Sequence, residues 1–514
     1  MNNTINHVVI LGGGSAGWLT AALLQAELGD HLNSVTVIES PSLKPLGVGE
    51  GTWPSMRGTL ERIGIKESDL VRHCQATFKQ GSAFFGWRNG SDIYHHPFSA
   101  PWQQTSIDSS LFWAAQANHL PFAHVVSGQP RLIEQGIAPK DITTPEYAAI
   151  NNYGYHFDAN GFVALLKQHA CETLGVKLIV DEVIAVNACA ETQHILSLTC
   201  QQYGDITADL FIDCSGFDSV LLAKHYQVPF HSVKDRLFND SALAVQVPYS
   251  CAQHPIQSAT LATAQPHGWI WEIGLQNRAG IGHVFSSDHC SEADATANLM
   301  AYIAQKYPHI KDLEPRLFKF TPGYREQFWH KNVLAIGMAA GFVEPLEASA
   351  LAMVELSARF LVEQFPYQAA QLADNAAAFN HLFKARWQDI VDFLKLHYVL
   401  SERTEAYWRQ HQDGMYCSAR LQQWLRKWST TLPSRYDLPM IEGLFPAASW
   451  QYVYYGMQNA PANVSLKLNR QQQRIAAQTA KEYPAFQQKL TQQLRLPSNR
   501  ELINKILKHG LATV

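Results

Sequence analysis

Lys79 is the first side chain whose type and surroundings favour chemistry. It lies in the segment Thr77-Phe78-Lys79-Gln80-Gly81, directly after an apolar phenylalanine. Burial of an ammonium is costly unless the group works or is paired, so a lysine in such a setting is suited to holding or polarising a reacting group. The alternative is a surface lysine whose stem packs on apolar neighbours while its ammonium stays in water.

Glu347 is the second such side chain, in the stretch Gly-Phe-Val-Glu-Pro-Leu-Glu-Ala-Ser-Ala-Leu at residues 341–351. The pattern predicts a turn that opens a helix. Backbone N–H groups at a helix start favour an anion without any side-chain charge, and a nearby carboxylate is suited to accepting a proton. The alternative is an ordinary N-capping segment with acids in its first turn.

A dinucleotide-binding unit is predicted at the beginning of the sequence. A short buried strand over residues 7–11 leads into Gly12, Gly14 and Gly17, then an apolar helix, then a second strand that ends at Glu39. Gly12 makes the tight turn, Gly14 lets the backbone approach a pyrophosphate, and Gly17 lets helix and strand pack closely. The helix start faces the phosphates, and Glu39 would accept a hydrogen bond from a ribose hydroxyl.

The run Trp269-Ile270-Trp271-Glu272-Ile273-Gly274 is a rare strand pattern. Strand alternation places both indoles on one face, where they serve as cavity wall or as plain core residues. Further strand signals around it predict a sheet-rich region. They lie at residues 177–180, 194–200, 243–247 and 282–286.

Several of these segments together resemble the flavin-dependent tryptophan halogenase family. The tryptophan run is similar to its signature Trp-x-Trp-x-Ile-Pro, with Gly274 in place of proline. The 341–351 stretch resembles Phe-x-Glu-Pro-Leu-Glu-Ser-Thr-Gly, with Ala348 for serine and Ala350 for glycine. The lysine segment resembles the family's catalytic-lysine segment. Other matching segments are 47–52, 155–158, 209–217 and 322–325.

The resemblance implies that Lys79 and Glu347 are catalytic and that the backbone amides of Ser349 and Ala350 hold a halide beside FAD. It implies chlorination or bromination of an indole-like, electron-rich aromatic through a flavin hydroperoxide and hypohalous acid. Because of the departures at Gly274, Ala348 and Ala350, the last of which lacks the backbone freedom of glycine, a flavin-binding protein without turnover stays open as an alternative. The implied FAD contacts are Gly12, Gly14, Ser15, Ala16, Gly17, Glu39, Val48, Gly49, Val183, Gly337, Met338 and Leu351.

A flavin aromatic hydroxylase is the rival enzyme, because its nucleotide domain has the same order of strands. Such enzymes carry a Gly-Asp pair late in the chain, where this chain has Gly337-Met338. They also carry an Asp-Gly segment ending in arginine, where this chain has Ser215-Gly216 and Leu222. The missing elements imply that a separate flavin reductase supplies the reduced flavin.

The substrate is expected to be an indole without the free amino-acid group. In relatives a His-x-Phe pair sandwiches the indole, which His96 and Phe98 match, although a turn histidine before Pro97 is an equal alternative. Trp450 and Tyr454 are expected to line the substrate pocket from the C-terminal region. Residues 450–457 hold no acid to pair an ammonium, so free tryptophan is disfavoured and an indole on something larger is favoured.

The expected fold is α/β, with an FAD-binding Rossmann-like domain of the glutathione-reductase type, an inserted sheet-rich region and a helical C-terminal lobe. Buried strands at residues 209–213 and 332–336 return to the nucleotide domain and make it discontinuous. The predicted boundaries are residues 1–365 for the FAD-binding and substrate-sheet domain and residues 366–514 for the helical lobe, which completes the substrate pocket.

Composition sets further expectations. The 514 residues carry a formal net charge of -4, which gives no basic field for nucleic acid. No secretory signal or membrane-spanning run is visible, so a cytoplasmic location is expected. The eight cysteines show no Cys-x-x-Cys spacing, so neither a metal site nor a disulfide framework is expected. The sequence leaves the oligomeric state open, a homodimer included.

Overall fold

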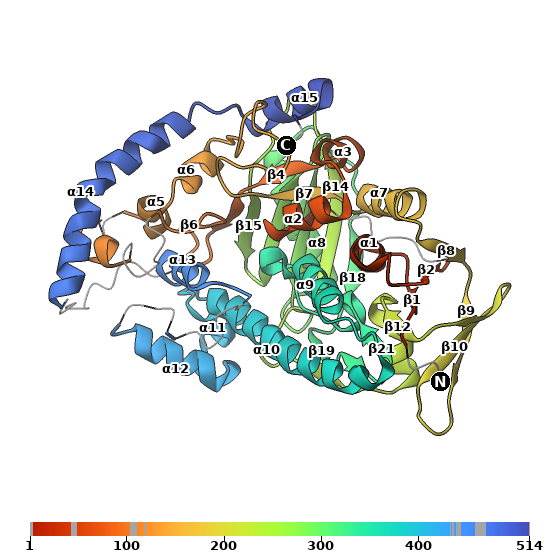
Figure 1. Ribbon diagram of the computed structural model, residues 1–514. Helices are drawn as coiled ribbons and strands as arrows, with labels where there is room; N and C mark the ends of the chain where they lie inside the picture. The colour runs from red at the N-terminus through yellow and green to blue at the C-terminus, as the bar shows by residue number, and fades with distance from the viewer. Residues whose placement is uncertain are drawn as a thin grey trace. The chain divides into compact units, whose positions relative to one another are not determined.

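The computed structural model describes residues 4–42, 49–102, 110–117, 120–431, 433, 436–437, 444–457 and 469–512 (Figure 1). The chain folds into two compact units. Unit 1 comprises residues 1–76, 157–232 and 321–387, and unit 2 comprises residues 77–156, 233–320 and 388–514. Each unit is therefore built from three separate stretches of chain.

The centre of unit 1 is a six-stranded sheet in the order β20-β21-β12-β1-β2-β8. Its strands run parallel, except that β20 pairs antiparallel with β21. This is the doubly wound arrangement predicted for a nucleotide-binding domain. The strands are β1 (His7–Leu11), β2 (Ser34–Glu39), β8 (Lys177–Val180), β12 (Leu210–Asp213), β20 (Trp329–His330) and β21 (Val333–Ala335).

Helices cover this sheet. Helix α1 lies against α7, α9 and α2 within unit 1 (Figure 1). The apolar run of α1 explains its burial, because Trp18, Leu19 and Leu23 are all withdrawn from solvent. The helices are α1 (Ser15–Leu28), α2 (Ser55–Ile63), α3 (Glu67–His73), α7 (Ala159–Glu172) and α9 (Ser349–Glu363).

Two predicted strands belong to unit 1 rather than to the inserted sheet-rich region. The strand at 177–180 is β8, which pairs in parallel with β2. The strand at 194–200 is β10 (Ile195–Cys200), in a separate antiparallel sheet with β9 (Val183–Ala188) and β11 (Gly204–Thr207). An apolar run of this length suits either sheet, so periodicity alone does not assign it. A third small sheet joins β13 (Phe230–Ser232), β19 (Gly323–Arg325) and β22 (Gly341–Phe342).

Unit 2 is organised around a seven-stranded sheet in the order β18-β14-β17-β16-β15-β5-β6. Its pairs are antiparallel except β15 with β5. Helix α8 (Glu292–Lys306) packs on β14 and β17 over a core that includes Ile270, Ile281 and Leu299. The strands are β5 (Gly81–Phe85), β6 (Ile93–Pro97), β14 (Ser241–Pro248), β15 (Thr260–Gln265), β16 (Gly268–Gly274), β17 (Arg278–Phe285) and β18 (Arg316–Lys319).

Most of the described residues beyond 366 are helical, as expected, but this region does not form a unit of its own. Helix α10 (Leu372–Val399) starts in unit 1 and ends in unit 2, and α13 (Ala447–Met457) packs on β6 within unit 2. The division therefore falls inside α10 rather than at residue 365. The remaining C-terminal helices are α11 (Ala406–Gln412), α12 (Ala419–Trp428), α14 (Arg470–Gln493) and α15 (Asn499–His509). No helix of the described residues is long and apolar enough to cross a membrane.

Candidate active site

The glycine turn after β1 has no room for side chains at two positions. Gly12 has φ +122°, and a Cβ there would lie 2.2 Å from the carbonyl oxygen of Cys214. A Cβ on Gly17 would lie 1.9 Å from the carbonyl oxygen of Gly12. Gly14 is different, because no heavy atom among the described residues lies within 4 Å of its Cβ position. The turn is tight at its base and open at Gly14, which suits the close approach of a pyrophosphate.

The start of α1 completes this site. Gly14 caps the helix, and no side chain among the described residues caps the first amides, which begin at Ser15. Glu39 ends β2 beside the turn, where a Cβ on Gly13 would lie 2.6 Å from its carboxylate. Lys167 Nζ contacts the same carboxylate at 3.0 Å. The set fits a dinucleotide, with phosphate at the helix start and a ribose hydroxyl at the acid.

The structure brings one further predicted FAD residue to this turn. Gly337 has φ +72° at the start of a short 3-10 helix, and a Cβ on it would lie 2.9 Å from the Cβ of Ala16. Met338 follows in the same helix. Leu351 is buried in α9, Val183 begins β9, and Gly49 begins β3 (Gly49–Gly51). Val48 lies outside the described residues.

The turn before α9 has an unusual backbone. Glu347 and Ala348 have φ of 64° and 54°, the left-handed region that non-glycine residues rarely adopt. Such strain persists only where the surroundings impose it, and it clusters at functional sites. The indole of Trp53 donates a hydrogen bond to the Glu347 carbonyl at 2.8 Å, and Ala348 N–H donates to the Pro345 carbonyl at 3.0 Å.

Helix α9 starts with its amides available. Ala348 is its N-cap and supplies no side-chain hydrogen bond among the described residues, and Ser349 to Ala352 include no acid. Ser349 is buried and Ala350 is exposed. Ala350 is absent from the described non-glycine residues with positive φ, so glycine freedom is not needed there. The strained positions are Glu347 and Ala348 instead, which corrects the concern about Ala350.

Lys79 is buried, so the alternative of a surface lysine is wrong. It ends β4 (Thr77–Lys79), its side chain is 1% exposed, and it pairs with Gly154 of β7 (Gly154–Asp158). Its Nζ lies 5.2 Å from the centre of the Phe98 ring, within range of a cation–π contact. Burial and the charge of Lys79 hold the pKa of His156 well below its usual value.

The two indoles of β16 lie on the sheet of unit 2. The rings of Trp269 and Trp271 are 6.3 Å apart and both side chains are buried. The Trp271 ring lies over its partner on β17, Gly282. A Cβ at position 282 would lie 2.0 Å from that ring, so only glycine leaves room for it. Gly274, which replaces the proline of the signature, accepts a hydrogen bond from the Thr77 hydroxyl at 2.6 Å. The segment before Lys79 is thereby tied to the tryptophan strand.

His96 is a strand residue, so the alternative of a turn histidine is wrong. It is buried in β6, and its Nε2 lies 2.9 Å from the Ser449 hydroxyl. Trp450 and Tyr454 sit in α13 with their polar atoms occupied, since the indole donates to the Phe445 carbonyl at 3.2 Å and the phenol to the Trp428 carbonyl at 2.9 Å. These contacts favour packing roles for both side chains rather than the predicted place in the substrate pocket.

Sequence reasoning missed two groups around α9. Trp53 directly follows the 47–52 segment, which is the one signal that could have pointed to it. Glu355 is buried and accepts hydrogen bonds from the hydroxyls of Thr59 at 2.8 Å and Ser55 at 2.9 Å. Burial raises the pKa of Glu355 to about 7. Nothing local in the sequence distinguishes Glu355 from an exposed helical glutamate.

Fold and site together define a nucleotide-binding α/β protein with a strained turn at a helix start, and comparison with known proteins gives its class. The family model described as tryptophan halogenase matches residues 7–473. The structure of a tryptophan halogenase from Shewanella frigidimarina is similar with a TM-score of 0.91 and 44% identity, covering 100% of both chains.

Curated relatives agree with this match. Tryptophan 6-halogenase SttH of Streptomyces toxytricini is 33% identical over 86% of this chain and 88% of its own. Tryptophan 7-halogenase RebH of Lentzea aerocolonigenes is 30% identical over 80% of each. The chain belongs to the tryptophan halogenase family. It is an enzyme, a flavin-dependent halogenase whose cofactor is FAD and whose co-substrate is a halide, and this membership argues against the hydroxylase alternative.

Proposed function

We propose that this enzyme chlorinates or brominates an indole-bearing substrate, using O₂ and reduced FAD that a separate flavin reductase supplies. The observation that carries the proposal is the left-handed pair Glu347 and Ala348 at the uncapped start of α9. The turn holds an acid beside the first amides of a helix that no side chain caps among the described residues, which is the arrangement that an anion and a proton transfer require.

The glycine turn and the start of α1 would hold the FAD pyrophosphate, and Glu39 would hold a ribose. Reduced FAD, when bound there, would supply two electrons to O₂, and the oxygen activated in this way would oxidise the halide. Membership in the family and the open space at Gly14 support this assignment. The absence of Asp at position 338 and of Arg at position 222 supports delivery of reduced flavin by a separate protein.

The halide is assigned to the amides of Ser349 and Ala350. A 15-residue helix places partial positive charge at its first amides, and residues 349–352 contain no acid to repel the anion. Glu347 orients the electrophile or accepts the proton that leaves when the ring regains its aromaticity. Its buried carboxylate and fixed backbone support this role.

Lys79 is assigned to holding and polarising hypohalous acid, or to forming a haloamine with it, beside the substrate ring. A buried ammonium on a strand is rigid, and the Phe98 ring 5.2 Å from its Nζ limits where it can point. The same ring and His96 are assigned to flanking the indole. The bond from His96 Nε2 to Ser449 fixes the plane of the imidazole.

The substrate class follows from the relatives and from α13. The two curated relatives are halogenases of tryptophan by name. In this chain α13 has no acidic residue, so it offers no carboxylate to a substrate ammonium. We therefore assign an indole without the free amino-acid group, with bromide serving as well as chloride.

Location and assembly are also proposals. All eight cysteines are free thiols, which suits a reducing compartment and supports a cytoplasmic location. The reductase would act by diffusion or in a transient complex. A homodimer is the proposed assembly, and sedimentation of the purified protein tests it.

One assay tests the function. The protein is combined with FAD, a flavin reductase, NADH, bromide and three candidates in parallel: indole, tryptophan and a tryptophan-containing peptide. Mass spectrometry should show brominated indole or peptide in preference to brominated free tryptophan. Oxygenated products without halogenated ones would favour a hydroxylase. FAD binding without product and without any effect of halide on the flavin spectrum would favour a carrier.

A further inference from the structure

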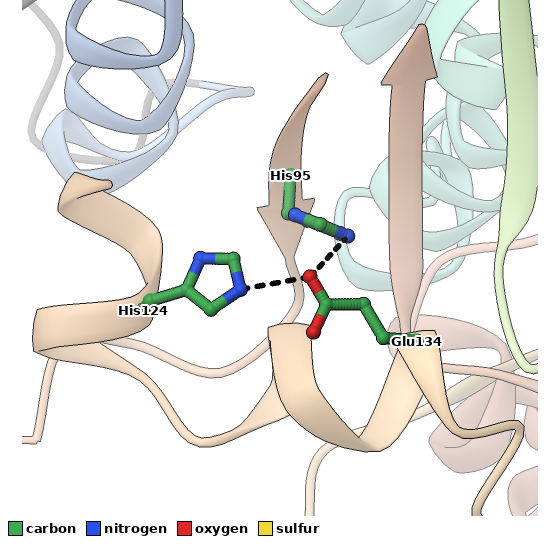
Figure 2. A group of neighbouring side chains, drawn as sticks. All are labelled: His95, His124 and Glu134. Carbon is green, nitrogen blue, oxygen red and sulfur yellow. Dashed lines mark hydrogen bonds and ion pairs between the residues drawn. The ribbon is translucent and has the colours of Figure 1, made fainter. Parts of the chain in front are cut away.

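Three side chains of unit 2 converge at a place that the halogenation site does not use. His95 comes from β6, His124 from α5 (Phe122–Val126) and Glu134 from α6 (Gln129–Glu134) (Figure 2). His124 Nε2 lies 2.8 Å from Glu134 Oε1, and His95 Nε2 lies 3.8 Å from the same oxygen. One ligand atom of each residue lies within 4.8 Å of the others.

Hydrogen bonding does not account for His95. At 3.8 Å its Nε2 is too far from the carboxylate for a hydrogen bond. Its Nδ1 is buried without a hydrogen-bond partner among the described residues. The Nε2 edge of His95 nevertheless faces the Glu134 carboxylate, and one ligand atom of His124 lies within 4.8 Å of both, which is a spacing that a shared cation can bridge.

We propose that His95, His124 and Glu134 bind one Zn²⁺ ion, with water as the fourth ligand. Two imidazoles and one carboxylate are a known zinc ligand set, and Zn–N and Zn–O bonds of about 2.0 to 2.2 Å place ligand atoms roughly 3.4 Å apart in a tetrahedron. The observed separations of His124 Nε2 and His95 Nε2 from Glu134 Oε1, 2.8 Å and 3.8 Å, lie on either side of that spacing.

Exposure suits this role. The side chain of His95 is 3% exposed, that of His124 20% and that of Glu134 46%, so one side is closed and the carboxylate side admits the ion and a water.

The ion would join three elements that meet near the lysine segment. His95 and His96 are neighbours on β6 and point to opposite faces of the strand. In α6, Gln129 accepts a hydrogen bond from Ser99 N–H at 2.6 Å and donates to the Gln80 side chain at 3.3 Å. A zinc ion at Glu134 would tie α5 and α6 to β6. The ion therefore has a structural role and takes no part in halogen transfer.

The test uses the full chain without a polyhistidine tag, freed of metal by chelation and dialysis. Zn²⁺ titration should give one bound ion per chain and raise the Tm, and Co²⁺ should give the visible absorption of a tetrahedral site. His124→Gln and Glu134→Gln should each weaken Zn²⁺ binding at least about 10-fold and abolish the Co²⁺ bands. Both residues are partly exposed, so both variants are expected to fold.

The matched control is His509→Gln, which removes an exposed histidine of α15. This variant should bind Zn²⁺ as tightly as the unchanged protein does. Mg²⁺ should bind to neither protein, because imidazole ligands disfavour Mg²⁺. Failure of the unchanged chain to bind Zn²⁺ would overturn the proposal. So would equal Zn²⁺ affinity in the unchanged chain and in His124→Gln or Glu134→Gln.

Discussion

The indole N–H of Trp53 is bound to the backbone carbonyl of Glu347 across 2.8 Å. Glu347 has a φ of 64°, a backbone conformation that is unfavourable for an L-amino acid and persists only where the surrounding structure imposes it. Trp53 follows the strand β3, while Glu347 precedes α9. A side chain far away in sequence therefore fixes the backbone of the proposed catalytic carboxylate.

Replacing Trp53 by phenylalanine should lower the halogenation turnover number about 10-fold, because loss of one hydrogen bond to a strained carbonyl costs on the order of 1 to 1.5 kcal/mol. FAD affinity, followed by flavin fluorescence, should stay the same. Trp408→Phe is the matched control, since its indole also donates to a carbonyl, that of Gln265, at 2.8 Å. Equal turnover losses in both variants would show that Trp53 only stabilises the fold.

Lys79→Met should abolish halogenation while FAD affinity and the reoxidation rate of reduced flavin stay nearly unchanged. The methionine fills a similar volume and removes a buried charge, so the Tm should not fall. Lys140→Met is the control, since Lys140 is equally buried in unit 2 and its Nζ donates to the Pro145 carbonyl at 3.0 Å. A Lys79→Met protein that still halogenates at a comparable rate would remove Lys79 from the mechanism.

Glycine should act in opposite directions at two neighbouring positions of the α9 turn. Ala348→Gly relieves a left-handed alanine and should raise the free energy of unfolding by about 1 to 2 kcal/mol. Ala350→Gly introduces a residue of low helix propensity in the first turn of α9 and should lower the free energy of unfolding by about 1 kcal/mol. Chemical unfolding of both variants measures the difference, and changes of the same sign would contradict the described backbone.

The stability of unit 1 should fall as pH rises from about 4.5 to above 7. The pKa of Glu355 is 4.5 in an exposed setting and about 7 in the folded protein, because burial opposes its charge. Between these two pKa values the folded state binds one proton more at Glu355 than the unfolded state does. The contribution of Glu355 to the free energy of unfolding is therefore complete below pH 4.5 and is lost as pH rises through 7. The difference of 2.5 pKa units corresponds to about 3 kcal/mol above pH 7.

Glu355→Gln should remove that dependence, because its amide does not ionise. The amide oxygen can accept from one of the hydroxyls of Ser55 and Thr59, and the amide N–H can donate to the oxygen of the other. Unfolding at pH 5 and pH 8 should show a smaller difference for the variant than for the unchanged protein. Glu363→Gln, an exposed change in the same helix, should keep the full dependence. Parallel pH curves for the unchanged protein and Glu355→Gln would contradict the raised pKa.

The parts of the fold predicted well from sequence are those whose signals are contiguous. The turn at Gly12, the helix α1 and the acid Glu39 follow one another within a single strand–helix–strand unit, so spacing alone indicated their arrangement. The helical nature of the C-terminal region was also readable from its periodicity. Its grouping with the sheet of unit 2 was not, because that depends on the packing of segments far apart in sequence, such as α13 on β6.

The site divides in the same way. A single sequence could not show that Trp53 reaches Glu347, nor which residue of the 341–351 stretch carries positive φ, because both result from tertiary packing. The expectation of no metal site rested on cysteine spacing. Cysteine spacing carries no information on His95, His124 and Glu134. These three residues come from different elements and approach one another only in the folded chain.

The chain passes between unit 1 and unit 2 five times, since each unit takes three stretches of a single polypeptide. No truncation at either end can release one unit whole, and a cut within α10 severs both. Attempts to crystallise or graft a minimal catalytic fragment should therefore yield misfolded protein. Replacing surface loops within one stretch, or permuting the termini, is the workable route to engineering this halogenase.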